Sequence, residues 1–273
     1  SMIGVSALGM MIFTSRPVGD AMATTIWGTS SSWTLTALPL FVWMGEILFR
    51  TKLSENLFEG LSPWMQKLPG GLIHVNVVGC ALFAAISGSS AATVATVGKM
   101  SIPELRKRKY PEKILLGSLA GSGTLGLLIP PSIILIIYGV TTQESIAKLF
   151  IAGILPGIMI ALIFMSYVII WSLINKKEMP ISYENFSFLE KIKKSKQLLP
   201  VIILILAVIG SIYTGVATAT EAASLGVVGA LIVSYFQKTL SLDTFKKSLL
   251  GATKTSCMIA FILAGSTFLS LAM

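Results

Sequence analysis

The apolar residues of this chain fall into long blocks, and this feature limits the possible folds more than any other. The blocks cover residues 70–87, 114–140, 147–171, 198–215, 222–236 and 256–273. A helix that crosses a bilayer needs about 20 mostly apolar residues, and several blocks reach that length. Only 12% of the residues are charged, against about 25% in a soluble domain. We therefore expect an all-α polytopic membrane protein that lies in a lipid bilayer.

The basic residues are concentrated between these blocks. Nineteen of the 21 Lys and Arg residues lie in four segments, which are residues 50–67, 99–113, 176–196 and 238–254. Loops on the cytoplasmic side of a membrane protein are enriched in Lys and Arg. The four segments are thus expected on the cytoplasmic side. The net charge of +9 is explained by this topology, and nucleic acid is not an expected partner.

This topology predicts a re-entrant helical hairpin over residues 70–98. Its flanking basic residues, Lys67 and Lys99, should lie on the same side of the membrane. The run 70–87 is long enough for most of a crossing, but residues 91–98 are too few for a second one. A turn at Gly88, Ser89 and Ser90 would reverse the chain. Non-helical backbone at membrane depth is tolerated only where protein or a watery cavity covers it, so the turn is a candidate functional site.

The block 114–140 is expected to be a discontinuous helix. Three glycines and two consecutive prolines interrupt it, at Gly121, Gly123, Gly126, Pro130 and Pro131. Glycine costs a helix about 1 kcal/mol and proline about 3 kcal/mol relative to alanine. Two half-helices that meet near the midplane are a sequence sign of a transporter's binding site. The alternative is a kinked helix that serves only packing.

The remaining segments complete the expected topology. Residues 35–48 should cross inward, and residues 147–171, 198–215 and 222–236 should form further spans around a cytoplasmic loop at 175–197. Two basic amphipathic stretches, 53–65 and 242–250, are expected to be helices on the membrane surface. The chain begins and ends inside apolar stretches, so we expect residues 256–273 to be the start of a truncated span.

Hydroxyl groups gather at the predicted hairpin turn, on Ser87, Ser89, Ser90 and Thr93. Hydroxyls and freed carbonyls are hard oxygen ligands for a small cation, and helix N-termini favour an anion. The alternative is that these hydroxyls bond back to helix carbonyls or permit close packing.

Two carboxylates lie within or beside apolar blocks, where such groups are usually functional. Glu46 is four residues before Arg50, and both an intramembrane and an interfacial position remain open for it. Glu221 opens a span, where Thr218 or Thr220 would act as the N-cap and the carboxylate would face the positive helix end.

The other reactive side chains suggest no further chemistry. Asn76 could bond across helices, and His74 is expected at the membrane interface. Cys80 and Cys257 lie in apolar surroundings and indicate neither a disulfide framework nor a metal site.

An intramembrane serine hydrolase is an alternative. It would need His74 as the base for Ser89, but fifteen helical residues separate the two by about 22 Å, where about 3 Å is required. We therefore expect no enzyme activity. A passive channel is a further alternative, and it would conduct without saturation by a coupling ion.

Several motifs resemble those of one transporter family. They are residues 68–71 (LPGG), 85–93 (AISGSSAAT) with Gly98, 102–105 (IPEL), 122–126 (SGTLG), 129–132 (IPPS), 138–140 (YGV), 148–153 (KLFIAG) with Pro156 and Gly157, and 220–223 (TEAA). In this order, over nearly the whole chain, they resemble the large membrane (M, DctM-like) subunit of tripartite ATP-independent periplasmic (TRAP) transporters.

The resemblance implies an elevator-type secondary transporter of the bacterial inner membrane, in which a transport domain slides against a scaffold. It implies Na⁺-coupled import of a small organic anion, such as a C4-dicarboxylate or a sialic acid. The implied partners are a small membrane (Q-type) subunit and a periplasmic substrate-binding protein, with no cofactor besides the coupling Na⁺. A related carrier that works without a binding protein is the alternative.

The resemblance also implies a division of the chain and a set of site residues. Residues 1–66 would hold scaffold-type helices and a cytoplasmic amphipathic helix, 67–140 part of the transport domain, 141–255 further spans, and 256–273 the start of the truncated span. The implied Na⁺ ligands are Ser87, Gly88, Ser90, Gly123, Thr124 and Pro130, and the implied substrate contacts are Ser89, Thr93, Pro131 and Ser132.

Large subunits of this family continue into a second inverted half with its own hairpin. On this resemblance the second Na⁺ site and part of the substrate site would lie outside residues 1–273, and these residues alone are not expected to transport.

Overall fold

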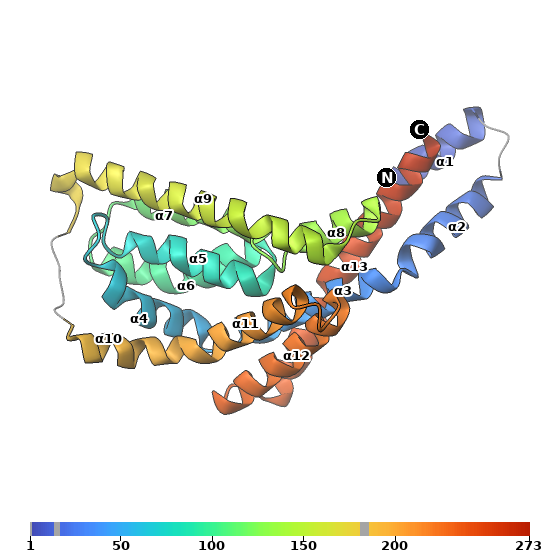
Figure 1. The fold of residues 1–273 in the computed structure, drawn as a ribbon. Coiled ribbons are helices and arrows are strands. Elements are labelled where there is room, and N and C mark those ends of the chain that lie inside the picture. The colour runs from blue at the N-terminus through green and yellow to red at the C-terminus, as the bar shows by residue number, and fades with distance from the viewer. Residues whose placement is uncertain (1, 14–16, 181–185) are drawn as a thin grey trace.

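The computed structural model describes residues 2–13, 17–180 and 186–273, and every regular element within these ranges is a helix (Figure 1). The expected all-α class is confirmed. The elements before the hairpin are α1 (Met2–Phe13), α2 (Val18–Ser30), the 3₁₀ turn η1 (Trp33–Thr36), α3 (Ala37–Phe49) and α4 (Leu53–Met65).

Within the described ranges, four helical segments are long and apolar enough to cross a membrane. They are Ile146–Ile174, Phe188–Tyr213, Ala219–Phe236 and Leu242–Ala272. The pair α2 and η1–α3, which is bent by 56°, adds a fifth if it is counted as one span. Apolar side chains stay exposed along these helices, as with Leu155, which is 78% exposed. The chain is therefore a multi-pass membrane protein.

Residues 73–107 form a helical hairpin. Helix α5 (Ile73–Ser87) has 15 residues and is thus about 22 Å long, which is shorter than the hydrocarbon core of about 30 Å. Helix α6 (Ser90–Lys107) returns beside it. The expected end of the hairpin at residue 98 is wrong, since α6 continues for nine residues. Arg106 and Lys107 lie in its last turn, where positive charge is favourable at a helix C-terminus.

The predicted broken span is confirmed. Helix α7 (Glu112–Gly123) passes into the 3₁₀ turn η2 (Thr124–Leu127), and after an irregular stretch helix α8 (Ile133–Thr142) begins. Pro130 and Pro131, joined by a cis peptide bond, lie in that stretch. Proline has no N–H to donate, and its ring clashes with the preceding turn, so a helix cannot run through both residues.

The C-terminal half corrects two expectations. Residues 242–250 and 256–273 form one continuous helix, α13 (Leu242–Ala272), so the expected boundary before residue 256 falls inside a helix. No proline lies between the two stretches, and Gly251 alone does not end the helix. The expected loop 175–197 contains η3 (Lys176–Glu178) and α10 (Phe188–Ser195), and it continues through η4 (Lys196–Leu198) into α11 (Leu199–Tyr213). Residues 181–185 of that loop lie outside the described residues.

Helix α4 also departs from the expectation of a surface helix. The stretch 53–65 is helical as predicted, but Leu53, Leu57, Phe58 and Leu61 are buried. They lie in the hydrophobic core, and α4 packs on α5, α6 and α10. Its apolar face is covered by protein rather than by lipid.

Helix α3 lies between two groups of helices. On one side it packs against α12 (Ala219–Phe236) and α13, and on the other against α5 and α8. The hairpin, α4, α7 and α9 (Ile146–Ile174) form the second group, while α1, α2 and the end of α13 extend away from it (Figure 1). The hairpin tip therefore meets α3 where the two groups join.

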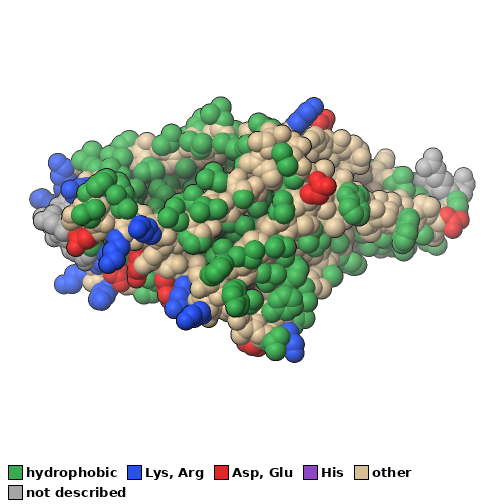
Figure 2. Space-filling view, turned by 60° about the horizontal axis from the view of Figure 1, so that its bottom comes forward, with side chains coloured by type: hydrophobic (Ala, Val, Ile, Leu, Met, Phe, Trp, Pro, Cys, Tyr) green, Lys and Arg blue, Asp and Glu red, His purple; other side chains and the backbone are tan. Residues whose placement is uncertain are grey.

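Basic side chains gather at one end of the molecule (Figure 2). Lys67 and Lys176 line one cavity there, and Arg108 and Lys194 line another. Three of the four basic segments thus meet at this end, as expected for segments on a common side of the membrane.

Candidate functional site

The tip of the hairpin is a two-residue reversal of the chain. Gly88 ends α5 in the left-handed region, with φ 58° and ψ 11°, and its N–H donates to the carbonyl of Ala84 at 3.1 Å. Glycine adopts this conformation without the steric cost of a side chain. Ser89 is extended and caps α6, where its hydroxyl accepts from the N–H of Ala92 at 3.4 Å. The turn predicted at Gly88, Ser89 and Ser90 is confirmed for the first two residues, and Ser90 is already the first residue of α6.

Oxygen atoms converge inside this tip. The Ser87 hydroxyl lies 3.0 Å from the Thr93 hydroxyl and 3.3 Å from the carbonyl oxygen of Ser89. The Thr93 hydroxyl donates to that same carbonyl at 2.7 Å. Thr93 is fully buried and Ser87 is 6% exposed. The Thr93 hydroxyl therefore bonds back to a carbonyl of its own helix end, which is the alternative to a role in ligand binding. The three oxygens also form a compact cluster of hard oxygen groups beside the hairpin turn.

The tip packs closely against the broken span. The backbone N–H of Ile133, the first residue of α8, donates to the carbonyl of Gly88 at 3.3 Å. A Cβ on Gly88 would lie 2.8 Å from the carbonyl oxygen of Pro131. On the other side, a Cβ on Gly126 would lie 2.9 Å from the carbonyl of Ser89. Glycine at these two positions is what allows the two backbones to touch.

The predicted site residues are placed as follows. Gly123 packs on Val94 of α6, and a Cβ there would lie 3.7 Å from the carbonyl of Ser90. Ser132 precedes α8, is fully buried and donates to the carbonyl of Leu127 at 2.6 Å. The structure therefore brings Ser87, Gly88, Ser89, Ser90, Thr93, Gly123, Pro131 and Ser132 together.

Two predicted residues point elsewhere. The Thr124 side chain is exposed, and its hydroxyl donates to the carbonyl of Gly121 at 2.7 Å. The Pro130 ring lies toward α9, since a Cβ on Gly153 would be 3.7 Å from its Cδ.

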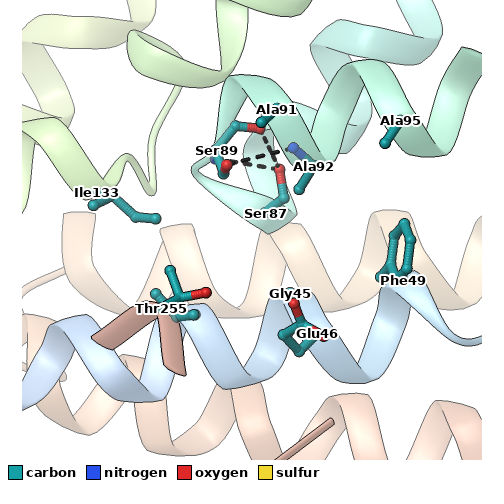
Figure 3. Close-up of a pocket in the computed structure, with 11 residues that line it drawn as sticks. Gly45, Glu46, Phe49, Ser87, Ser89, Ala91, Ala92, Ala95, Ile133 and Thr255 are labelled. Carbon is teal, nitrogen blue, oxygen red and sulfur yellow. Dashed lines mark hydrogen bonds between the residues drawn. The ribbon is translucent and has the colours of Figure 1, made fainter. Parts of the chain in front are cut away.

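A cavity of about 270 Å³ separates the tip from α3 and α13 (Figure 3). At its edge the helices almost touch, since a Cβ on Gly45 would lie 3.0 Å from the Cα of Ser87. Its lining comprises Val42, Gly45, Glu46, Phe49, Ser87, Ser89, Ala91, Ala92, Ala95, Ile133 and Thr255. Sequence reasoning missed Thr255, since a single threonine in a long helix carries no signal of its own.

Glu46, whose position the sequence left open, lies in this cavity wall. Its Oε2 accepts from Nη2 of Arg50 at 2.9 Å in an i,i+4 pair, and its side chain is 25% exposed. The carboxylate packs on α13, where a Cβ on Gly251 would lie 2.5 Å from Oε2. It is thus a half-buried carboxylate fixed between two helices.

His74, expected at the membrane interface, is covered by protein. His74 is fully buried, and its Nε2 lies 2.7 Å from the carbonyl oxygen of Pro69. Gly70 and Gly71 both have positive φ, and the turn they form folds back over the imidazole, since a Cβ on Gly70 would lie 3.1 Å from Nε2. His74 stands at the opposite end of α5 from Ser87.

Two other predictions for single residues are confirmed. The Asn76 amide donates from α5 to α7, to the carbonyl of Leu115 at 3.3 Å and the hydroxyl of Ser118 at 3.0 Å. Thr218 is the N-cap of α12, and it forms a capping box with Glu221. The Glu221 carboxylate accepts from the backbone N–H of Thr218 at 2.7 Å.

Comparison with known proteins adds an independent observation. The family model described as "Tripartite ATP-independent periplasmic transporter, DctM component" matches residues 1–273. The C4-dicarboxylate TRAP transporter large permease protein DctM of Pseudomonas aeruginosa is 35% identical over 97% of this chain, which covers 61% of that protein.

Two further relatives carry other substrates in their names. The sialic acid TRAP transporter large permease protein SiaM of Vibrio cholerae is 32% identical over 96% of this chain and 61% of its own length. The isethionate TRAP transporter permease protein DctMQ of Oleidesulfovibrio alaskensis is 32% identical over 97% of this chain and 42% of its own length. The chain thus spans less than two thirds of each of these relatives.

Proposed function

Because this chain belongs to the DctM component family of tripartite ATP-independent periplasmic transporters, we propose that it serves the Na⁺-coupled import of a small organic anion. The observation that carries the proposal is the contact between a polar hairpin tip and a broken span. Half-helices and unwound backbone that meet at membrane depth are the usual place for substrate and coupling ions in secondary transporters.

The coupling ion is assigned to the oxygen atoms of the hairpin tip and the broken span. Its ligands would come from the hydroxyls and carbonyls of Ser87, Gly88 and Ser90 together with the main chain of Gly123, Thr124 and Pro130. The assignment is best supported for Ser87, because its hydroxyl belongs to the cluster with the Thr93 hydroxyl and the Ser89 carbonyl. Oxygen ligands of this kind replace the hydration shell of a small cation.

The substrate carboxylate is assigned to the same contact between the tip and the broken span. Ser89, Thr93, Pro131 and Ser132 are the proposed contacts. Ser89 and Ser132 precede the N-termini of α6 and α8, where free N–H groups and the helix dipole favour an anion. The relatives named above differ in substrate, and all three substrates in their names are small organic acids or anions.

Coupling follows if the cation orders the tip. Among the described residues, one backbone hydrogen bond of 3.3 Å, from Ile133 to Gly88, joins the turn to the broken span. Na⁺ would join the tip oxygens to the broken span, and the substrate would then bind a site whose ordering is already complete. Substrate affinity should therefore rise with Na⁺, and an unchanged affinity would contradict this step.

An elevator-type motion and three components complete the proposal. The hairpin with α7 and α8 would move as the transport unit against a scaffold that includes α3, in the bacterial inner membrane. A Q-type small subunit and a periplasmic binding protein would be the partners, which the description of the family as tripartite and periplasmic supports. The name DctMQ of one relative also fits a small membrane partner.

Uptake into proteoliposomes tests this function. They would contain the full-length transporter with its small subunit, candidate organic acids and the binding protein, with and without an inward Na⁺ gradient. The variants are Ser90→Ala at the tip and Ser166→Ala as the matched control, because Ser166 is exposed on α9 and bonds only back to Leu162.

We expect uptake that requires Na⁺ and the binding protein, and that falls in Ser90→Ala only. Uptake that needs Na⁺ but not the binding protein would favour the carrier that works alone. Uptake indifferent to Na⁺ would refute the ion assignment and favour proton coupling or a channel.

A further inference from the structure

The polar side-chain atoms of the residues that line the cavity beside the hairpin tip are all oxygen atoms. They belong to Glu46 on α3, Ser87 and Ser89 on the hairpin, and Thr255 on α13 (Figure 3). No Lys, Arg or His is among the residues that line the cavity. Arg50 and Lys254 are sequence neighbours of lining residues, but they do not line it themselves. The lining therefore suits a cation better than an anion.

The carboxylate of Glu46 retains one oxygen for this cavity. Arg50 binds Oε2, and Gly251 packs against the whole carboxylate, since a Cβ there would lie 2.5 Å from Oε2 and 3.1 Å from Oε1. Within the described part of the chain, Oε1 accepts no hydrogen bond, and the side chain is 25% exposed. Glu46 can therefore interact with a mobile ion while its position stays fixed by Arg50.

The cavity is large enough for an ion with its water. Its volume of about 270 Å³ corresponds to about nine water molecules at about 30 Å³ each. A partly hydrated monovalent cation fits without moving the helices. A second negative charge beside a carboxylate in such a half-buried space is disfavoured.

The cavity runs from the tip toward the basic end of the molecule. It begins at Ser87 and Ser89 and extends to Phe49 and Ala95. Phe49 directly precedes Arg50, and Ala95 is one turn before Lys99, so this part of the lining is adjacent in the chain to basic residues. On the proposed topology this is the cytoplasmic side.

We infer that this cavity is the path by which the coupling cation passes between the hairpin tip and the cytoplasmic side, and that Glu46 attracts the cation there. The inference rests on the proposed Na⁺ coupling and adds a residue outside the ion site to it. Arg50 opposes Glu46, because its positive charge reduces the negative potential in the cavity. Removing the charge of Glu46 should therefore lower the Na⁺ affinity, and removing the charge of Arg50 should raise it.

Binding of ²²Na⁺ to the purified full-length transporter with its small subunit tests this. The variants are Glu46→Gln and Arg50→Gln. The matched controls are Glu104→Gln and Arg108→Gln, a second i,i+4 pair of similar exposure at 3.0 Å that does not line the cavity. We expect Glu46→Gln to weaken Na⁺ binding by about three- to tenfold and Arg50→Gln to tighten it by about threefold, as for one unit charge within several ångströms. The controls should leave the affinity unchanged.

Opposite changes of Na⁺ affinity in the two variants distinguish electrostatic attraction by Glu46 from a merely structural role of the ion pair. If the ion pair only supports the fold, both variants weaken Na⁺ binding, and the inference is overturned. It is also overturned if neither changes the affinity while the wild type binds Na⁺. If the wild type binds no Na⁺, the proposed coupling itself fails. Should Glu46→Gln fail to fold, the double variant Glu46→Gln/Arg50→Gln keeps the net charge and should bind more weakly than Arg50→Gln.

Discussion

The backbone N–H of Ile133 donates to the carbonyl oxygen of Gly88 at 3.3 Å, so the second half of the broken span begins on the tip of the hairpin. Two interruptions that are 45 residues apart in the sequence thus form one structural unit. Neither could stand alone at membrane depth, because each leaves backbone groups that need partners.

Gly88→Ala should disrupt the unit. Alanine in the left-handed region costs about 1–2 kcal/mol, and its methyl group would lie 2.8 Å from the Pro131 carbonyl. We expect at least a tenfold loss of Na⁺-dependent uptake. Gly215→Ala is the control, because Gly215 also has positive φ, at 72°, but has nothing within 4 Å of a Cβ. Gly215→Ala should have a lower melting temperature, because alanine is strained at positive φ, but it should retain Na⁺-dependent uptake. Equal uptake in both variants would show that the contact with Pro131 is unimportant.

Gly126→Ala should separate the hairpin from the 3₁₀ turn. Its Cβ would lie 2.9 Å from main-chain atoms of Ser89 and Ser90, which cannot move independently of the tip. We expect weaker Na⁺ binding and a lower melting temperature. Gly117→Ala, in α7 with nothing within 4 Å, should instead stabilise the protein by about 1 kcal/mol. Thermal unfolding in detergent and ²²Na⁺ binding measure both effects, and a melting temperature unchanged in Gly126→Ala would contradict the packing described.

Asn76 should stabilise the pairing of α5 with α7. Its amide bonds to Leu115 and Ser118 across the two helices, and such bonds in membrane proteins contribute about 0.6 kcal/mol on average. Asn76→Ala and Ser118→Ala should each lower stability, and a double-mutant cycle should give a coupling energy of about that size. Strictly additive effects would show that the two side chains do not interact.

Thr218→Ala should destabilise α12 without affecting the ion site. The capping box with Glu221 satisfies two helix-end N–H groups, and loss of an N-cap costs about 1 kcal/mol. Thr214→Ala is the control, because the Thr214 hydroxyl bonds only back to the carbonyls of Gly210 and Ser211. We expect a lower melting temperature for Thr218→Ala alone, with Na⁺ affinity unchanged in both variants. A change in Na⁺ affinity would mean that α12 contributes to the site.

Elements with strong local signals were predictable from the sequence. The break in the span follows from Pro130 and Pro131, the hairpin turn from Gly88 and its hydroxyl neighbours, and the cap of α12 from Thr218 and Glu221. Each of these rests on backbone chemistry within a few residues. The gathering of basic residues at one end was predictable because charge is excluded from the hydrocarbon core.

Features that depend on distant packing were not predictable. His74 is polar and near a basic segment, so an interfacial position was expected, but the turn at Gly70 and Gly71 covers it. The polar residues after Gly98 predict that the hairpin ends near Lys99, but α6 continues to Lys107. The cavity between Glu46 and Thr255 joins helices more than 200 residues apart in the sequence, a proximity that no local pattern records.

The most direct test of the ion site at the hairpin tip is ²²Na⁺ binding to the full-length transporter with its small subunit, for the wild type, Ser87→Ala and the control Ser166→Ala. Ser87→Ala removes one oxygen of the cluster but leaves the hydrogen bond of Thr93 to Ser89 in place. The proposed site predicts Na⁺ binding at least tenfold weaker in Ser87→Ala and unchanged in Ser166→Ala. Wild-type affinity in a correctly folded Ser87→Ala variant would contradict it.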